Sequence, residues 1–390
     1  MRTVSAIKNI NSTLIVYGLN MVLQFIIRFV LLYYLSIEYL GLNGLFDNIL
    51  TVLSLTELGI GPAIIFSLYS PLANHDLETA KSIMRIFKKA YIYIGTLILF
   101  LGLCISPFVQ YLIKVPPNIA YLNIFFLLFV VDTGISYFYS YKKCLLIADQ
   151  KQYIANYYRG ITQLIGSLFQ IALVILTHSF WVYIILRICM TFSENFLIAR
   201  KADHLYSFLN EKNIQPLNKD IYQNIIRNIK ALILHKIGGV TVFGTSNIIL
   251  SKFVGLSAVA LYTNYYLIIN GIDKLSDQVF NALKASVGNL NESHDDAHKL
   301  VIFKRLEFMT AYLACFICSN LYLLLNPFIT IWLGSSYRFD ESIVLWMVIN
   351  FYLMFMRKGV LVFKDAMGLF WQNRYMSLIE ALINLGSSIV

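Results

Sequence analysis

Polar and charged side chains recur at steps of three or four residues inside long apolar segments, the spacing that places them on one face of a helix. The stripes are Asn20, Gln24 and Arg28; Asn43, Asp47, Thr51, Ser54 and Glu57; Asp132, Ser136, Ser140 and Lys143; Arg159, Gln163, Ser167 and Gln170; Arg187, Thr191 and Glu194; and Asn270, Asp273, Asp277 and Asn281. Neutral members of a stripe can simply bond between helices. A charge facing lipid costs about 2.5–3.5 kcal/mol, so the charged members should face one another or a wet cavity.

Three cations lie near the middle of apolar segments, namely Arg28, Arg187 and Lys236. Guanidinium and ammonium groups bind phosphoryl oxygens strongly in a low dielectric. We therefore expect these residues, with Gln24 and Asn247, to bind an anionic cargo such as a phosphate.

Acids accompany these cations inside the apolar segments, namely Glu57, Asp132 and Glu194. They can neutralise the cations, or they can carry coupling protons or sodium ions. Both roles remain open from the residues alone.

The segment that holds Glu57 is interrupted directly after it, in TELGIGPA (56–63). Proline removes a backbone hydrogen bond and kinks a helix, and glycine weakens it. Gly59, Gly61 and Pro62 are therefore candidates for a hinge, although kinks are also common in helices that do not move.

The elements that must position these residues are membrane-spanning helices. Only 13% of the 390 residues are charged, against about 25% in a globular protein, and 58% are hydrophobic. Runs of about 20 apolar residues mark spans. We expect eleven, at 12–35, 41–69, 86–113, 119–141, 155–177, 179–199, 222–250, 256–284, 302–325, 341–363 and 373–390.

Basic residues outside the spans fix the orientation. With the N-terminus in the cytoplasm, 25 of the 31 Lys and Arg fall on the inner side, Lys142 and Lys358 among them, and three on the outer side. This distribution accounts for the net charge of +10 without nucleic acid as a partner. We expect a multi-pass protein of a cytoplasmic membrane.

The chain divides at its longest inner connection, which is also its most polar stretch. We expect an N-terminal lobe of six helices over 1–201, a cytoplasmic loop over 202–221 and a C-terminal lobe over 222–390. The second helix of each half opens similarly, with LSIEYLGLNGLF (35–46) against VGLSAVALYTNY (254–265). An even number of helices per half is typical of parallel repeats in transporters.

Signs of enzyme chemistry, metal binding or cofactor binding are weak. His294 and His298 have helical spacing, but they lie in a charged inner loop that we interpret as solvated. The five cysteines follow no disulfide pattern, and no phosphate-binding loop of the G-x-x-x-x-G-K-[ST] type occurs. We expect no catalytic residue, metal or cofactor, and transport driven by a proton or sodium gradient, by the membrane potential or by mass action.

Three blocks of the chain resemble the polysaccharide repeat-unit flippases (Wzx-type) of the multidrug/oligosaccharidyl-lipid/polysaccharide exporter superfamily. They are YLGLNGLFDNILTVLSLTELGIGPAIIFSLYSPLA (39–73), YKKCLLIADQKQYI (141–154) and LHKIGGVTVFGTSNIILSKFVGLSAVALYTNY (234–265). The resemblance implies bacterial export of undecaprenyl-pyrophosphate-linked oligosaccharides for capsule, O-antigen or exopolysaccharide. It also implies two six-helix lobes of a multidrug-and-toxin-extrusion-like fold around a cationic cavity with alternating access.

Within this resemblance, Arg28, Arg187 and Lys236 are candidates for the pyrophosphate, and membrane lipids, a polysaccharide polymerase and glycosyltransferases are implied partners. Two departures stand out: Ser246 lies where an acid is expected, and the chain ends at Val390, one helix short of twelve. We therefore expect a C-terminal lobe without its last helix. The alternatives are a multidrug exporter of the same fold and a membrane glycosyltransferase or polymerase.

Overall fold

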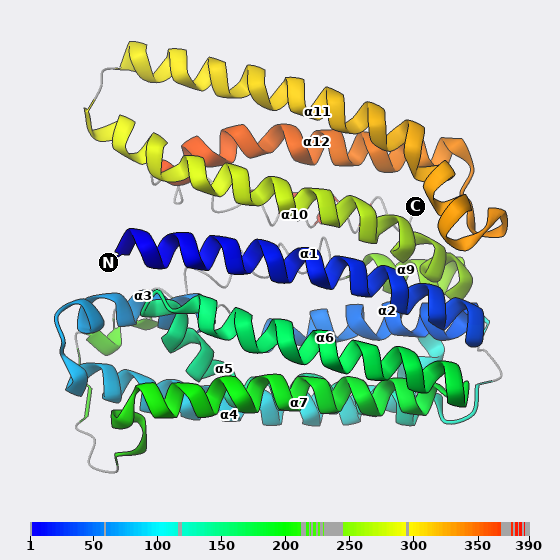
Figure 1. The fold of residues 1–390 in the computed structure, drawn as a ribbon, viewed down its shortest axis with the longest axis horizontal. Helices are drawn as coiled ribbons and strands as arrows, with labels where there is room; N and C mark the ends of the chain where they lie inside the picture. The colour runs from blue at the N-terminus through cyan, green and yellow to red at the C-terminus, as the bar shows by residue number, and fades with distance from the viewer. Residues whose placement is uncertain are drawn as a thin grey trace. The chain divides into compact units, whose positions relative to one another are not determined.

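The computed structural model describes residues 2–57, 60–115, 119–211, 245–293 and 296–367, with isolated positions in 216–229 and 376–386. The described chain is almost entirely helical (Figure 1). Its elements are α1 (Arg2–Tyr34), α2 (Ile37–Leu53), η1 (Ser54–Glu57), α3 (Ile60–Ala73), α4 (Leu77–Ile105), η2 (Ser106–Leu112), α5 (Leu122–Ala148), α6 (Gln152–Thr177), α7 (Phe180–Leu205), η3 (Ser207–Asn210), α9 (Ser246–Phe253), α10 (Leu256–Ser293), α11 (Asp296–Leu333), η4 (Ser335–Tyr337) and α12 (Glu341–Ala366).

Seven described helices are long and apolar enough to cross a membrane, and the bent pair of Ile37–Glu57 and Ile60–Leu72 makes up to eight. They coincide with eight of the eleven predicted spans. The predicted spans 222–250 and 373–390 lie largely outside the described residues. The remaining span, 256–284, is helical within α10, but Asn264, Asn270 and Asp273 dilute its apolar residues. The all-helical membrane fold is confirmed, whereas the count of eleven is not.

Contacts divide the chain into two units, Met1–Val259 with Ser377–Val390, and Ala260–Met376. Each unit is described by itself. The predicted lobes 1–201 and 222–390 and the loop 202–221 stay a prediction, because most of residues 212–244 lie outside the described part of the chain.

The first unit is held together by a series of helix contacts. α1 packs along α6, α6 packs against α7, and α5 packs against both α4 and α7. Glycines allow α4 and α5 to approach closely: a Cβ on Gly102 would lie 2.3 Å from Val130 Cγ1, and one on Gly134 would lie 2.8 Å from Leu99 Cδ2. Small residues at such contacts are typical of membrane helices, where close packing rather than water exclusion holds helices together.

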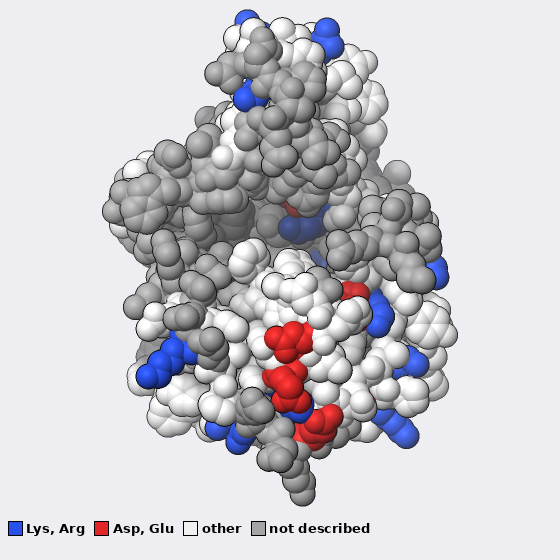
Figure 2. Space-filling view, turned by 90° about the vertical axis from the view of Figure 1, so that its left-hand side faces the viewer, with Lys and Arg blue, Asp and Glu red and all other residues white. Residues whose placement is uncertain are grey.

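Acidic and basic side chains gather at the end of the first unit at which α1 begins and α7 ends (Figure 2), and several of them form ion pairs. Lys81 is buried between Glu78 and Glu211, at 2.7 and 2.6 Å. Lys142 of α5 reaches Asp203 of α7 at 2.6 Å. These ion pairs link α4 to the segment after α7 and α5 to α7 at this end of the unit.

Polar side chains outside the spans form hydrogen bonds at the helix termini. Asp76 caps α4 by accepting the backbone N–H of Thr79 at 3.0 Å, and hydrogen bonding from the Thr79 side chain together with this backbone N–H lowers the pKa of the Asp76 carboxyl. Tyr206 donates to Asp149 at 2.6 Å, and partial burial together with this bond raises the pKa of the Tyr206 phenol.

The second unit packs α10, α11 and α12 around an apolar core that includes Ile269, Leu325 and Phe355. A polar network closes one end of it. The Tyr265 hydroxyl donates to Asn326 and accepts the backbone N–H of Phe339 at 3.0 Å. This network joins α10 to α11 and to the connection before α12.

Candidate functional site

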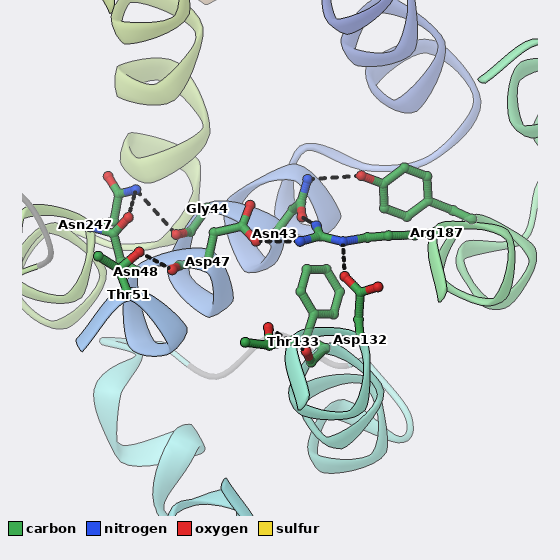
Figure 3. Close-up of polar contacts among 11 residues, drawn as sticks. Asn43, Gly44, Asp47, Asn48, Thr51, Asp132, Thr133, Arg187 and Asn247 are labelled. Carbon is green, nitrogen blue, oxygen red and sulfur yellow. Dashed lines mark hydrogen bonds and ion pairs between the residues drawn. The ribbon is translucent and has the colours of Figure 1, made fainter. Parts of the chain in front are cut away.

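A polar cluster around Arg187 joins three helices of the first unit (Figure 3). Arg187 Nε of α7 donates to Asp132 Oδ2 of α5 at 2.9 Å. Its two terminal nitrogens donate to α2, Nη1 to Asn43 Oδ1 at 3.0 Å and Nη2 to Asp47 Oδ1 at 2.8 Å. One guanidinium therefore fastens α2, α5 and α7 together through charge-assisted bonds.

Helical spacing explains why these groups meet. Asn43 and Asp47 are four residues apart, so both lie on the face of α2 that is turned toward α7. Tyr183 lies one turn before Arg187 on α7, and its hydroxyl accepts from Asn43 Nδ2 at 3.1 Å. The Phe129 ring of α5 lies beneath the guanidinium, 4.4 Å from its central carbon, in cation–π geometry.

Arg28 of α1 adds a second guanidinium to this region, since it interacts electrostatically with Tyr183 and Asp47. Two cations thus share the region with two carboxylates, Asp47 and Asp132. The carboxylates differ in access, because the Asp132 side chain is 7% exposed and that of Asp47 is 47% exposed. Asp47 is therefore the more accessible of the two carboxylates.

The other predicted binding residues lie at different distances from this cluster. Asn247 of α9 is buried and donates through Nδ2 to Gly44 O at 3.2 Å and to Asn48 Oδ1 at 3.0 Å, so it supports α2 one turn from Asp47 (Figure 3). Gln24 is exposed, one turn before Arg28 on α1. Lys236 lies outside the described residues.

Glu57 lies at the break in the second span. It accepts from the Tyr91 hydroxyl at 3.1 Å and the Tyr137 hydroxyl at 3.5 Å. The helical axis bends by 45° between Ile37–Glu57 and Ile60–Leu72. A Cβ on Gly61 would lie 3.0 Å from both Glu57 Oε1 and the Tyr91 hydroxyl, so this position is packed tightly.

The bend coincides with the predicted hinge, but its movement stays a prediction. Gly59 lies outside the described residues, and Pro62 is exposed. Glu194 is paired with Arg159, at 3.9 Å, rather than with Arg187 on its own helix. Among the described residues, no group of three or more His, Cys, Asp or Glu could hold a metal.

Sequence reasoning missed a largely buried cation of the second unit, Lys358 of α12. Its ammonium pairs with Asp273 at 2.9 Å and also with Asp277, both on α10. The Lys358 side chain is 10% exposed, although its place near the end of the predicted span 341–363 led to its inclusion among the inner-side cations. The polar stripe over Asn270–Asn281 was the available signal, since its two acids required a partner.

Solved structures of transporters share this fold. The chain is similar to an inward-facing multidrug resistance MATE family transporter of the MOP superfamily, with a TM-score of 0.64 and 13% identity over 92% of this chain and 84% of that one. It is also similar to an outward-facing transporter of that family (TM-score 0.54, 12% identity, 98% and 94% covered) and to MATE in complex with MaL6 (0.52, 13%, 99% and 85%).

No protein-family profile matches the chain, and no curated protein matches it significantly. The structural likeness therefore establishes the fold: a multi-pass membrane protein with the architecture seen in MATE transporters.

Proposed function

We propose that this protein is an alternating-access exporter of phosphoryl-linked lipid oligosaccharides, the undecaprenyl-pyrophosphate-linked repeat units of bacterial surface polysaccharides. The observation that carries the proposal is the pair of arginines, Arg28 and Arg187, next to a half-exposed carboxylate. Such a site presents bidentate donors for phosphoryl oxygens inside a membrane fold. The resemblance of residues 39–73, 141–154 and 234–265 to repeat-unit flippases supports the same class of cargo.

The cluster suggests how an anionic head group enters. Asp132 holds Nε of Arg187 from the buried side, so the guanidinium keeps its position when its outer contacts change. A phosphoryl oxygen would take the place of Asp47 on Nη2. Loss of the Asp47 charge would remove the competitor for Nη2 and would favour binding of the anion.

A multidrug exporter is the second candidate, and the same carboxylate favours it. The charges of Arg28 and Arg187 are balanced by Asp47 and Asp132, and Phe129 and Tyr183 contribute aromatic surface. A lipophilic cation could pair with Asp47 and stack on an aromatic ring.

The substitution Asp47→Asn distinguishes the two candidates, because each predicts a different change in ligand affinity. Purified protein is titrated with fluorescent farnesyl pyrophosphate and, separately, with ethidium. For the flippase we expect the variant to bind the pyrophosphate about tenfold more tightly, because removing one competing charge is worth about 1–2 kcal/mol near Arg187. For a drug exporter we expect weaker ethidium binding and no change with pyrophosphate.

Glu38→Gln is the matched control, since it makes the same charge change nine residues earlier on α2. It should leave both titrations unchanged. The proposal fails if Asp47→Asn leaves pyrophosphate binding unchanged or weakens it. In cells, we expect Arg187→Gln to reduce surface polysaccharide in a strain that depends on this protein, with membrane insertion retained.

The proposed setting is the bacterial cytoplasmic membrane, with the N-terminus on the cytoplasmic side. The proposed partners are membrane lipids and the enzymes that make and polymerise the repeat unit, glycosyltransferases and a polysaccharide polymerase. Immunoprecipitation of the tagged full chain from native membranes, with and without active glycosyltransferases, tests these associations.

A further inference from the structure

A groove of about 770 Å³ runs between α1 and α6 of the first unit, on a different side of α1 from Arg28. One wall comes from α1 and the other from α6, with a single residue of α7 at one end. Its lining is Lys8, Asn11, Ser12, Ile15, Val16, Leu19, Tyr153, Ile154, Tyr157, Tyr158, Gly160, Ile161, Leu164 and Lys201.

Hydrogen bonds hold the two walls in place beside the groove. Asn9 of α1 donates to Gln150 O at 3.0 Å and accepts the backbone N–H of Tyr153 at 2.8 Å. Asn156 of α6 donates to Ser12 and Thr13 of α1, at 3.0 and 2.9 Å. The groove is therefore preformed, which reduces the entropic cost of binding.

Charge and polarity are distributed unevenly along the groove. Lys8 and Lys201 lie at the polar end, and no acid is among the lining residues. The Lys8 ammonium lies 5.7 Å above the Tyr153 ring, and Tyr157 is 63% exposed. Lysines and tyrosines of this kind are typical of the level at which lipid head groups lie.

The other end of the groove is apolar. Ile15, Leu19, Ile161 and Leu164 line it, and side chains just beyond it on the same helix faces, such as Val22 and Leu168, are exposed and hydrophobic. From Lys8 to Leu19 the wall is eleven residues long, which is about 17 Å along a helix. This length matches one leaflet of the bilayer core, about 15 Å.

We propose that this groove binds an anionic phospholipid of the bilayer, with its phosphate between Lys8 and Lys201 and one acyl chain along α1 and α6. The two lysines supply the charge complementarity, and the apolar length fits an ordinary acyl chain within a single leaflet. A long isoprenoid chain would extend far beyond it. The site lies away from the Arg187 cluster and does not depend on the proposed function.

The test is native mass spectrometry of the full chain released from nanodiscs that contain phosphatidylglycerol and phosphatidylcholine with identical acyl chains. We expect the wild type to retain phosphatidylglycerol in preference to phosphatidylcholine. Lys8→Gln with Lys201→Gln should lower that preference at least tenfold, since each basic residue near a head group contributes to binding of anionic lipid. Arg85→Gln with Lys89→Gln is the matched control, with the same loss of two exposed cations on α4, and should keep the preference.

A second variant, Ile161→Trp, fills the apolar part without changing the charge and should remove the adduct while the protein remains monodisperse. Equal retention by the wild type and the Lys8/Lys201 variant overturns the proposal. Equal loss in the Arg85/Lys89 control also overturns it, because the attraction would then be general. Retention of polyprenyl phosphate without competition from phosphatidylglycerol assigns the groove to an isoprenoid cargo and likewise overturns it.

Discussion

Replacing Arg187 by glutamine removes the group that fastens α2, α5 and α7 together. The largest consequence falls on Asp132, whose side chain is 7% exposed and whose Oδ1 atom has no hydrogen-bond partner within the described structure. Loss of one partner from a buried pair leaves an uncompensated charge and costs about 3–5 kcal/mol. Asp47 is 47% exposed, so its lost contact adds at most about 1 kcal/mol. We expect the free energy of unfolding to fall by about 4 kcal/mol.

The assay is reversible unfolding of the purified protein in mixed detergent and dodecyl sulfate micelles, followed by tryptophan fluorescence. Arg159→Gln is the control, because Arg159 is exposed and lies 3.9 Å from Glu194, which predicts a loss below about 1 kcal/mol. The same glutamine substitution at both positions separates the buried pair from a general effect of losing an arginine.

A double-mutant cycle gives the sharper measurement. Asp132→Asn removes the buried charge, so the combination of Asp132→Asn and Arg187→Gln should recover about 2–3 kcal/mol relative to the sum of the single losses. Additive losses, or a loss below about 1 kcal/mol for Arg187→Gln alone, would refute the reasoning that Asp132 depends on Arg187.

Three further predictions concern packing, capping and the second unit. Gly102→Ala should cost about 1–3 kcal/mol in the same unfolding assay because its methyl group meets Val130, whereas Gly18→Ala, with open space around it, should be neutral or slightly stabilising. Asp76→Ala should cost about 1 kcal/mol of α4 stability. Because the pKa of Asp76 is lowered in the folded chain, the cap contributes at neutral pH and is lost as the pH falls through that pKa, which amide hydrogen exchange at the start of α4 detects. Lys358→Met should destabilise the second unit by about 2 kcal/mol in the same unfolding assay. This is less than for Arg187→Gln because the two aspartates that pair with Lys358 are about a third exposed.

Periodicity in the sequence predicted the helices and the faces that carry the polar residues. The stripes containing Asp47, Asp132 and Arg187 do lie on facing sides of α2, α5 and α7. Which residue of one stripe contacts which residue of another was not predictable. The contacts depend on how each helix is rotated about its axis and how far it is shifted along it, and apolar patterns determine both only to within about a turn. Arg187 and Glu194 share a helix face, yet each has its partner on another helix.

Charged residues at the end of an apolar run were the hardest to place. Lys358 lies inside the predicted tenth span, 341–363, five residues before its end, yet it was counted with the inner-side cations; α12 runs to Ala366 and places the Lys358 ammonium against the acids of α10. Because Lys358 was counted elsewhere, the two acids of the stripe over Asn270–Asn281, Asp273 and Asp277, had no predicted partner. An unmatched acidic stripe is therefore a signal to look for a lysine or arginine inside a neighbouring helix.

Because α10 and α11 are long, a small tilt of either helix moves its ends by several ångströms. Each has 38 residues, which corresponds to about 57 Å, nearly twice the thickness of a bilayer core. A tilt of 10° about the midpoint of either helix displaces its end by about 5 Å. A fluorophore attached at exposed His298, in the first turn of α11, would therefore report a small tilt of this helix as a displacement large enough for distance measurements.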